Sequence, residues 1–415
     1  MSIFYYSFVL LTWLVVWIKH RNLLHPFLVT AFMWFIIPLL YEYMAFKYYS
    51  ISHLSFECYW FITLYLIVFL SVSNFIVKKR ITNEGLDSFE RPTMSNHIRF
   101  WAYLIFFCNM FLIFRFFTVC GSFSIIKIIV AFRILTTTGD GIPPDMKLLL
   151  YVFTMTAPLL LAIYFFKIRI KLPIKIGIII ELLLVTVFYA SKARVFKYFI
   201  MIFLLLFVKK KLNFKNTFFF IIIGGGALVG MVLIRDEQFI SKSYSFMDYV
   251  YVYLLSPLPA FDLLVQGEVP YVTTPVGGRT LGFFYRLLHK FSFNIALPEY
   301  DKMFIRVSAP SGTLPTNVYT AFGNSFMDWG FLGIVVYGIL SAILFSIYYK
   351  NLKKPVFLFL YLLTIYCLYF QFFGEFYFQF LSMGLQDIFA VIIILKKTNT
   401  VNYVFKYSGY ARLEK

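Results

Sequence analysis

Charged residues are scarce in this chain, and acidic ones are scarcer than basic ones. Only 14% of its 415 residues are charged, while 61% are hydrophobic and 22% are aromatic. A typical soluble domain has about 25% charged residues, so the composition excludes a soluble globular protein. Cysteine is also rare. The four cysteines, Cys58, Cys108, Cys120 and Cys367, lack the spacing of a metal site, and we expect them to be buried free thiols.

Several catalytic signatures are missing as well. The chain has no cluster of His, Asp and Glu with zinc spacing, no Gly-x-Ser-x-Gly elbow, and no Asp-x-Asp pair of the kind found in nucleotide-sugar transferases. Gly277-Gly278-Arg279-Thr280 has too few glycines for a nucleotide-binding loop, and we interpret it as a flexible turn that presents Arg279. These absences argue against a nucleotide-sugar donor, and we expect no metal and no cofactor.

Long apolar runs are what the chain has instead. They recur near 3–18, 27–45, 57–77, 100–119, 148–166, 176–190, 195–208, 216–234, 328–349, 355–373 and 378–395. Runs of about 17–25 residues are long enough to cross a membrane as helices. The sequence therefore predicts an all-α polytopic integral membrane protein, a single membrane domain over 1–415 with about 11 transmembrane helices (10–12).

The basic residues predict how these helices are oriented. The formal net charge is +19, and the lysines and arginines gather in every second gap between the runs, around 19–21, 78–80, 167–175, 209–215, 350–354 and from 396 onward. Short basic loops stay in the cytoplasm. We therefore expect the N-terminus outside and the C-terminus inside. Because the charges are spread over separate short loops, nucleic acid is not expected as a partner.

The longest interruption of the apolar pattern is a polar, proline-rich segment at 235–327, on the predicted outer side. A channel or carrier has little use for one large polar segment late in the chain. An enzyme that acts on a lipid-linked substrate at the membrane surface needs such a segment to build its site. The segment contains Arg235, Asp236, Glu237, Arg279, Arg286, His289, Arg306 and Asn317.

A short outer turn breaks the basic-inside pattern with Lys192, Arg194 and Lys197. Cations at the outer ends of two helices are costly unless they meet an anion, and a diphosphate is the anion that a lipid carrier brings. Guanidinium groups match phosphate oxygens in bidentate geometry, and ammonium groups add point charge. Arg235 is the natural companion, and Arg115 is the charge within a span that lies nearest the outer face. The alternative is that these cations bind lipid phosphates and anchor the helices.

The most distinctive sequence is Pro315–Gly333, in which Thr316-Asn317-Val318-Tyr319-Thr320 precedes Asp328-Trp329-Gly330-Phe331-Leu332-Gly333. It resembles the end of the main periplasmic loop in Wzy-type oligosaccharide repeat unit polymerases, the O-antigen polymerase family. In that family a Thr-Asn-x-Tyr-Thr stretch precedes an Asp-aromatic-Gly-x-x-Gly helix start. Ser191–Arg194 resembles the small-residue and arginine turn of the same family, and Arg235-Asp236 resembles its exit into the loop.

The resemblance implies a multi-pass enzyme of the bacterial inner membrane, similar in fold to GT-C-like membrane glycosyltransferases. It would join undecaprenyl-diphosphate-linked oligosaccharide repeats on the periplasmic face without a metal, with the N-terminus periplasmic and the C-terminus cytoplasmic. Membrane lipids and a chain-length regulator in the same membrane are the implied partners. The implied catalytic residues are Arg194, Arg235 and Arg279, which stabilise the leaving diphosphate, and Asp236, Glu237 and His289, the candidates for a general base.

The residues expected to bind substrate are Lys192, Lys197, Arg115, Arg286, Arg306, Asn317, Tyr319 and Asp328. Three alternatives stay open. A lipid-linked oligosaccharide flippase needs a cationic cavity across the bilayer, for which these spans carry few charges. An O-antigen ligase has the same chemistry but transfers the glycan to a lipid A core. A membrane protein with a purely structural role is the third.

Overall fold

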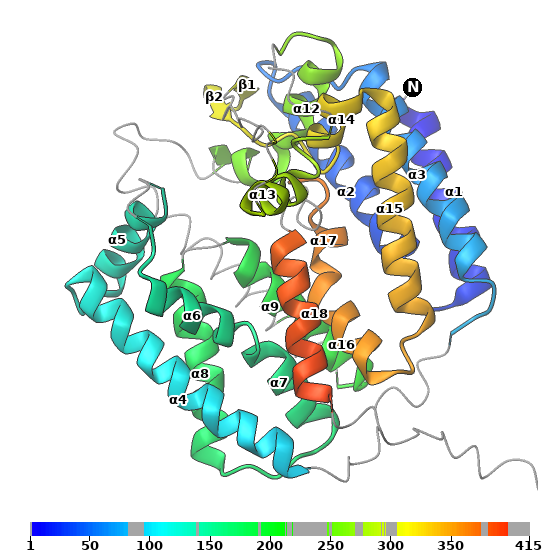
Figure 1. Ribbon diagram of the computed structural model, residues 1–415. Coiled ribbons are helices and arrows are strands. Elements are labelled where there is room, and N and C mark those ends of the chain that lie inside the picture. The colour runs from blue at the N-terminus through cyan, green and yellow to red at the C-terminus, as the bar shows by residue number, and fades with distance from the viewer. Residues whose placement is uncertain are drawn as a thin grey trace, which may run out of the picture. The chain divides into compact units, whose positions relative to one another are not determined.

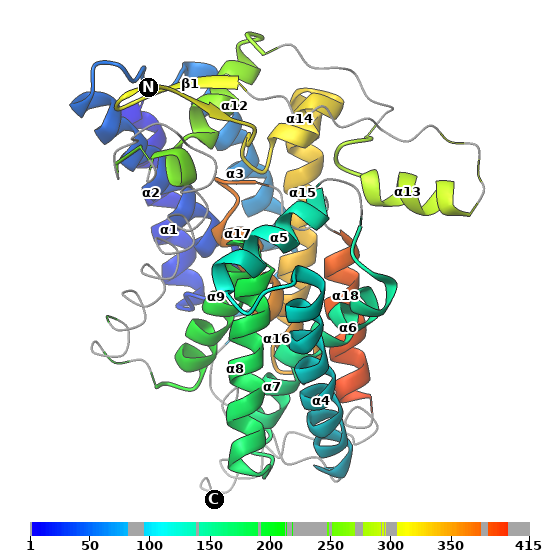
Figure 2. The ribbon, with the colours of Figure 1, turned by 90° about the vertical axis from the view of Figure 1, so that its left-hand side faces the viewer.

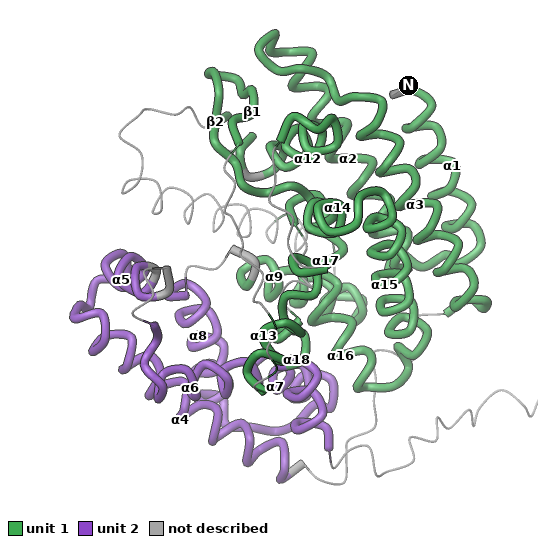
Figure 3. The backbone as a smooth tube through the Cα atoms, turned by 45° about the horizontal axis from the view of Figure 1, so that its top comes forward, with its two compact units in different colours: residues 1–84, 192–385 green, residues 85–191, 386–415 purple. Residues whose placement is uncertain are grey.

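The computed structural model describes residues 2–81, 95–137, 141–189, 192–211, 213, 218, 247–248, 251–269, 277–291, 293, 295, 305–374 and 381–396. Nearly all regular structure in these ranges is helical (Figure 1). The chain forms two compact units, which Figure 3 distinguishes by colour. Unit 1 comprises residues 1–84 and 192–385, and unit 2 comprises residues 85–191 and 386–415.

Six helices in the described ranges are long and apolar enough to cross a membrane: Ile3–His20, Pro26–Lys47, Phe56–Ile76, Asn96–Cys120, Pro144–Phe165 and Phe331–Lys350. Shorter apolar helices cover Pro355–Tyr369 and Leu381–Leu395. The coarse prediction of a helical chain with several potential membrane spans is therefore confirmed. The count of about 11 spans stays a prediction, and so does a single membrane domain made of both units. Most of the expected span at 216–234 lies outside the described residues.

Unit 1 is built on four long helices, α1 (Ser2–His20), α2 (Pro26–Lys47), α3 (Phe56–Ile76) and α15 (Phe331–Lys350). In Figure 1, α2 rises through the unit while the other three descend. One end of the unit, the upper end, thus carries residues 48–55 and α14 (Gly323–Trp329). The opposite or lower end carries residues 21–25, 77–81 and 351–354.

Helix α1 shows why these helices suit a membrane. Tyr5, Val9 and Val16 are almost completely buried in the protein. On another side of the same helix, Leu11 and Ile18 are exposed at 62% and 67%. A helix that is apolar on both its covered and its uncovered face is stable where lipid covers the second face.

Helices α3 and α15 pack closely because small residues line their contact. On α15, Gly338, Ala342 and Ser346 follow one another every four residues and are all buried. A Cβ atom on Gly338 would lie 3.1 Å from Val68. Small residues at this spacing let helix backbones approach each other in membranes, and the Ser346 and Ser73 hydroxyls are 2.9 Å apart across the contact.

Short elements complete unit 1. They are α9 (Lys192–Val208), the π-helix η1 (Tyr251–Leu255), α12 (Pro257–Val265), α13 (Gly282–Lys290), β1 (Ile305–Ala309), β2 (Gly312–Thr316), α14, α16 (Pro355–Thr364) and α17 (Tyr366–Tyr369). The two strands form an antiparallel hairpin that pairs Val307 with Leu314. The described part of the polar segment at 235–327 is thus folded into short helices and one hairpin.

Unit 2 contains α4 (Ser95–Cys120), α5 (Ile125–Thr137), α6 (Pro144–Phe153), α7 (Thr156–Phe165) and α8 (Leu172–Phe188), together with most of α18 (Leu381–Leu395). Helix α4 packs on α8, where Gly177 leaves room for the Phe106 ring. At the start of α4, His97 binds the Ile393 carbonyl of α18 at 3.1 Å. The four cysteines are free thiols, as expected, although Cys108 and Cys120 are only partly buried.

Candidate functional site

Two segments that the sequence analysis singled out are in contact at the upper end of unit 1. The turn at 277–280 packs against the end of α14. The two carboxylate oxygens of Asp328 accept hydrogen bonds from the backbone N–H groups of Arg279 and Thr280, at 3.1 and 2.7 Å. Gly277 has φ +74°, and a Cβ atom there would lie 2.6 Å from the Trp329 ring. Asp328 and Trp329 therefore fix the turn, and only glycine fits at position 277.

The fixed turn places Arg279 within electrostatic range of Tyr319. Both residues are buried, with exposures of 5% and 9%. Burial raises the pKa of the Tyr319 hydroxyl, and the positive charge of Arg279 acts in the opposite direction. The phenol stays neutral at physiological pH and can act as a hydrogen-bond donor.

The glycines after Asp328 are explained by the junction between α14 and α15. Gly330 has φ +60° and ends α14. A Cβ atom on Gly333 would lie 1.8 Å from the Ser325 carbonyl oxygen. The chain must reverse into a left-handed conformation and then pass very close to itself, and both steps favour glycine. The Asp-Trp-Gly-Phe-Leu-Gly sequence thus holds the Arg279 turn and also forms a tight junction between two helices. We call the two hydrogen bonds from the turn to Asp328 the clasp.

The residues before α14 are anchored in the core of unit 1. Phe322 stacks on Trp34, with ring centroids 4.7 Å apart. The buried side chain of Gln371 accepts a hydrogen bond from the Trp34 indole at 3.2 Å and donates one to Tyr65 at 2.6 Å. The Gln371 backbone carbonyl accepts a hydrogen bond from the N–H of Ala321 at 2.7 Å. The segment that follows Tyr319 is therefore held on several sides.

Thr320 adopts an unusual backbone conformation at this anchor. Its φ is +59°, which a β-branched residue rarely adopts. A β-bridge to Gly374 holds it in place. Such conformations cost of order 1–3 kcal/mol and are concentrated at functional sites. The strain at Thr320 therefore supports a functional role for the neighbouring Tyr319.

Helix α9 brings further predicted cations to this region. The centroid of the Phe196 ring lies 3.9 Å from that of Phe370, the residue that precedes Gln371. Lys197 is buried, and its ammonium lies 5.8 Å from the centroid of the Tyr198 ring. Arg194, one turn earlier, is half-buried. We use the name Arg279 site for the set of predicted residues on these connected elements: Arg194, Lys197, Arg279, Tyr319 and Asp328.

Other predicted residues lie elsewhere on unit 1. Arg286 and His289 are on α13, which Figure 2 shows apart from α12 and α14. Both side chains are exposed and bind nearby backbone carbonyls: Arg286 that of Gly282 at 3.2 Å, and His289 that of Ile295 at 3.2 Å. Arg306 on β1 and Asn317 after β2 are exposed.

Arg115 belongs to unit 2, where its Nε lies 2.7 Å from the Asp145 carboxylate. Its guanidinium also donates a hydrogen bond to the Thr118 hydroxyl at 3.3 Å. The structure thus gives this span charge an acidic partner. Lys192 begins α9, but its side chain lies outside the described part, as do Arg235, Asp236 and Glu237.

A carboxylate–imidazole pair at the upper end was missed by the sequence analysis. His53 Nδ1 donates a hydrogen bond to a carboxylate oxygen of Glu42 at 2.5 Å. The other Glu42 oxygen accepts from the Tyr59 hydroxyl at 2.8 Å and from the N–H of Leu54 at 3.2 Å. The Glu42 side chain is only 18% exposed, whereas that of His53 is 67% exposed. The arrangement fixes the imidazole and leaves its Nε2 open to the surroundings.

This pair is connected through α12 to Phe322, which lies in the sequence between Tyr319 and Asp328 of the Arg279 site. The carboxylate of Asp262 accepts hydrogen bonds from the backbone N–H of Ser55 at 3.0 Å and from its hydroxyl. The preceding residue, Phe261, packs on Phe322 with ring centroids 5.5 Å apart. The sequence signal for the pair was weak, because Glu42 ends an apolar run and His53 is one residue of a short loop.

Within the described ranges, no group of three or more His, Cys, Asp and Glu residues is arranged to hold a metal ion. The expectation of metal-independent chemistry stays a prediction.

Comparison with known proteins gives no match to a family model, to a curated protein or to a solved structure. The likeness to Wzy-type polymerases therefore rests on the motifs quoted above. One of these motifs, the Asp-Trp-Gly-Phe-Leu-Gly sequence, is in direct contact with the Arg279 turn.

Proposed function

We propose that the chain is a membrane glycosyltransferase that joins polyprenyl-diphosphate-linked oligosaccharide repeats, as Wzy-type polymerases do. The observation that carries the proposal is the double hydrogen bond from the Arg279 turn to Asp328. It fixes the backbone of a buried arginine that lies within electrostatic range of a tyrosine hydroxyl. Such a pair suits a diphosphate, because the guanidinium supplies charge and directional donors while the phenol adds a neutral donor.

The reaction needs stabilisation of a leaving group. The bond between the anomeric carbon of the growing glycan and its carrier diphosphate breaks, and the diphosphate leaves with the electron pair. The anomeric carbon bonds to a hydroxyl oxygen of the incoming unit, and the hydroxyl proton passes to a base. In this proposal Arg279 stabilises the charge that develops on the diphosphate, and Arg194 and Lys197 add positive charge from α9. Arg235 keeps its predicted role of binding the same diphosphate.

His53 is our preferred general base. Its Nδ1 is bound by Glu42 at 2.5 Å, so Nε2 is the nitrogen left to accept a proton from a sugar hydroxyl. Glu42 would stabilise the imidazolium that forms, as a carboxylate does for a histidine in other general-base pairs. Asp236, Glu237 and His289 stay as the candidates that the sequence suggested.

This function requires a defined arrangement in the membrane. We propose about 11 spans of GT-C-like organisation, with the upper end of unit 1 on the periplasmic face of a bacterial inner membrane. The support is the charge distribution, since the basic residues at 78–80 and 350–354 all lie at the lower end. Basic short segments favour the cytoplasm. The N-terminus would then be periplasmic and the C-terminus cytoplasmic, with membrane lipids and a chain-length regulator as partners.

The decisive experiment is reconstitution of the purified protein with lipid-linked repeat units. Extension without any nucleotide sugar, in excess chelator, is the expected result. Arg279→Ala should abolish extension, and Arg279→Lys should restore it poorly, because a point charge lacks the bidentate geometry. The matched control is Lys47→Ala, which removes an exposed cation at the same end of unit 1. Full activity of Arg279→Ala would refute the proposal that Arg279 stabilises the leaving diphosphate.

An experiment in cells distinguishes a polymerase from a flippase or a ligase. Loss of a polymerase leaves a single repeat on the lipopolysaccharide core, whereas loss of a flippase or a ligase leaves none. Deletion of the gene followed by gel analysis of lipopolysaccharide should therefore give the single-repeat band. A core without any repeat would favour one of the two alternatives.

A further inference from the structure

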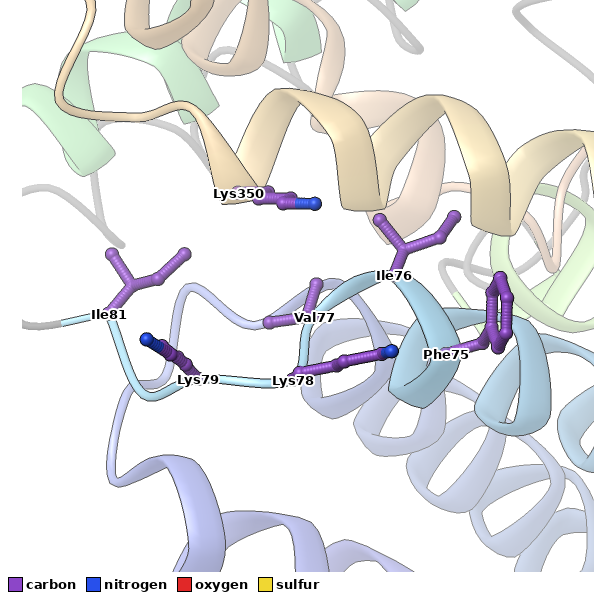
Figure 4. A pocket seen from close by; sticks show the side chains of 7 residues that line it. All are labelled: Phe75, Ile76, Val77, Lys78, Lys79, Ile81 and Lys350. Carbon is purple, nitrogen blue, oxygen red and sulfur yellow. The ribbon is translucent and has the colours of Figure 1, made fainter.

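The lower end of unit 1 has a cavity that the proposed reaction does not use. It has a volume of about 610 Å³ and lies between the end of α3 and the end of α15 (Figure 4). Its lining consists of Phe75, Ile76, Val77, Lys78, Lys79, Ile81 and Lys350. In Figure 4, Lys350 reaches in from α15, while Lys78 and Lys79 lie across from it on the segment after α3.

Hydrogen bonds fix the walls of this cavity. The side-chain amide of Asn22 donates to the Ile81 carbonyl at 2.9 Å, which ties the segment after α3 to the connection between α1 and α2. The N–H of Val77 donates to the Ser73 carbonyl at 2.8 Å. Ser73 in turn contacts Ser346 of α15 at 2.9 Å. The backbone that carries the lysines is therefore held by hydrogen bonds on both walls of the cavity.

The lining of the cavity combines positively charged side chains with apolar ones. Three ammonium groups share the cavity, and no carboxylate is among its lining residues. Like charges around one cavity repel each other, and an anion placed between them removes that cost. The aliphatic and aromatic side chains offer no hydrogen-bond partners. The ligand that matches both features carries a phosphate on an apolar body.

The position of the cavity identifies the source of such a ligand. Phe75, at the end of the apolar helix α3, is 75% exposed. The lysines follow immediately, so the boundary between apolar helix and basic segment crosses the cavity itself. That is the depth at which lipid headgroups meet acyl chains, and basic pockets between membrane helices bind anionic headgroups.

We propose that this cavity binds the phosphate headgroup of an anionic phospholipid. The phosphate lies between Lys350 on one side and Lys78 and Lys79 on the other. The acyl chains continue along Phe75 and Ile76 of α3. The site would couple the lower end of unit 1 to the lipid composition of the membrane, independently of the reaction at the upper end.

The test compares two double variants that remove the same charge from the same end of unit 1. Lys78→Gln/Lys79→Gln alters the cavity, whereas Lys353→Gln/Lys354→Gln alters the neighbouring loop, which does not line it. Purified protein in detergent is titrated with phosphatidylglycerol, and bound lipid is counted by native mass spectrometry. The cavity variant should bind about thirtyfold more weakly, because each lysine contributes about 1 kcal/mol near an anionic headgroup. The loop variant should bind like the wild type.

Further arms distinguish the source of the phosphate and exclude misfolding. Phosphatidylcholine should bind much more weakly than phosphatidylglycerol, and inorganic phosphate should not displace the lipid at millimolar concentration. A Lys78→Arg/Lys79→Arg variant should retain binding, which shows that the loss follows charge. Equal weakening by both glutamine variants, equal binding of both lipids, or displacement by phosphate would overturn the proposal. Because the readout is lipid binding, failure here leaves the proposed function standing.

Discussion

The clasp between Asp328 and the Arg279 turn makes a prediction with a definite magnitude. A backbone N–H bound to a carboxylate contributes about 1.5–3 kcal/mol, so the two bonds together hold the turn with about 3–6 kcal/mol. Asp328→Ala removes both. Asp328→Asn keeps one neutral acceptor worth about 1 kcal/mol and turns an amide NH₂ toward the other N–H. The alanine variant should therefore be the more severe, with the asparagine variant between it and the wild type.

Amide hydrogen exchange measures this effect at the site itself. If Asp328→Ala costs at least about 3 kcal/mol of local stability, the Arg279 and Thr280 amides should exchange at least about a hundredfold faster. The thermal midpoint should change much less, because α14 keeps its contacts with Trp34 and the core through Phe322. Glu268→Ala, which removes an exposed carboxylate from the same unit, should leave both amides unchanged.

The same variants connect the clasp to activity. Loss of polymer in Asp328→Ala together with fast exchange at Arg279 would show that the turn must be held for the reaction. Wild-type exchange rates in Asp328→Ala would refute the structural reasoning, whatever the activity. Fast exchange with full polymerisation would instead separate the clasp from catalysis and remove Arg279 from the proposed mechanism.

Three further predictions concern other positions. Gly333→Ala should prevent stable folding, since its Cβ would lie 1.8 Å from the Ser325 carbonyl oxygen, and a normal thermal midpoint would contradict the close approach. Burial lowers the pKa of His25 to about 3. An unfolded histidine titrates near 6.5, so the unfolded state binds more protons than the folded state between these two pH values. The free energy of unfolding should therefore fall as the pH drops, by up to about 1.4 kcal/mol per pH unit. Melting curves of His25→Asn should show a weaker pH dependence of stability, and a pH dependence equal to that of the wild type would refute this origin. His53→Gln should slow glycan transfer while leaving donor binding intact, and an unchanged rate would place the base elsewhere.

The helices were predictable because apolar length is a local property. An apolar run that exceeds the membrane thickness predicts a helix at nearly the same residues, as for 27–45 and α2 (Pro26–Lys47). The hairpin at β1 and β2 also had a local signal that was not used. Val307 and Leu314 are buried while their neighbours face outward, and Pro310 and Gly312 flank the turn.

The contacts that build the candidate site were not predictable from spacing. Trp34 and Gln371 bind each other although most of the chain separates them. The sequence alone predicts a flexible turn at 277–280, and nothing local indicates that Asp328 accepts its two N–H groups. Glu42 and His53 are close in sequence, yet their pairing depends on how α2 and the following loop end. Such contacts are decided by tertiary packing, which pattern analysis does not contain.

The rigidity of the Arg279 site follows from how its parts are held. Electrostatic stabilisation is most effective when the charged donor is already in place and needs no reorganisation as the reaction proceeds. Here Asp328 fixes the backbone of Arg279, while Gln371 fixes the backbone after Tyr319 through Ala321. Both supports form when unit 1 folds, so the energy that holds the backbone of Arg279 and maintains the strained Thr320 comes from folding. Under the proposed function, a phosphate that arrives at this site would meet an arginine whose backbone is already held, and less of its binding energy would be spent on ordering a loop.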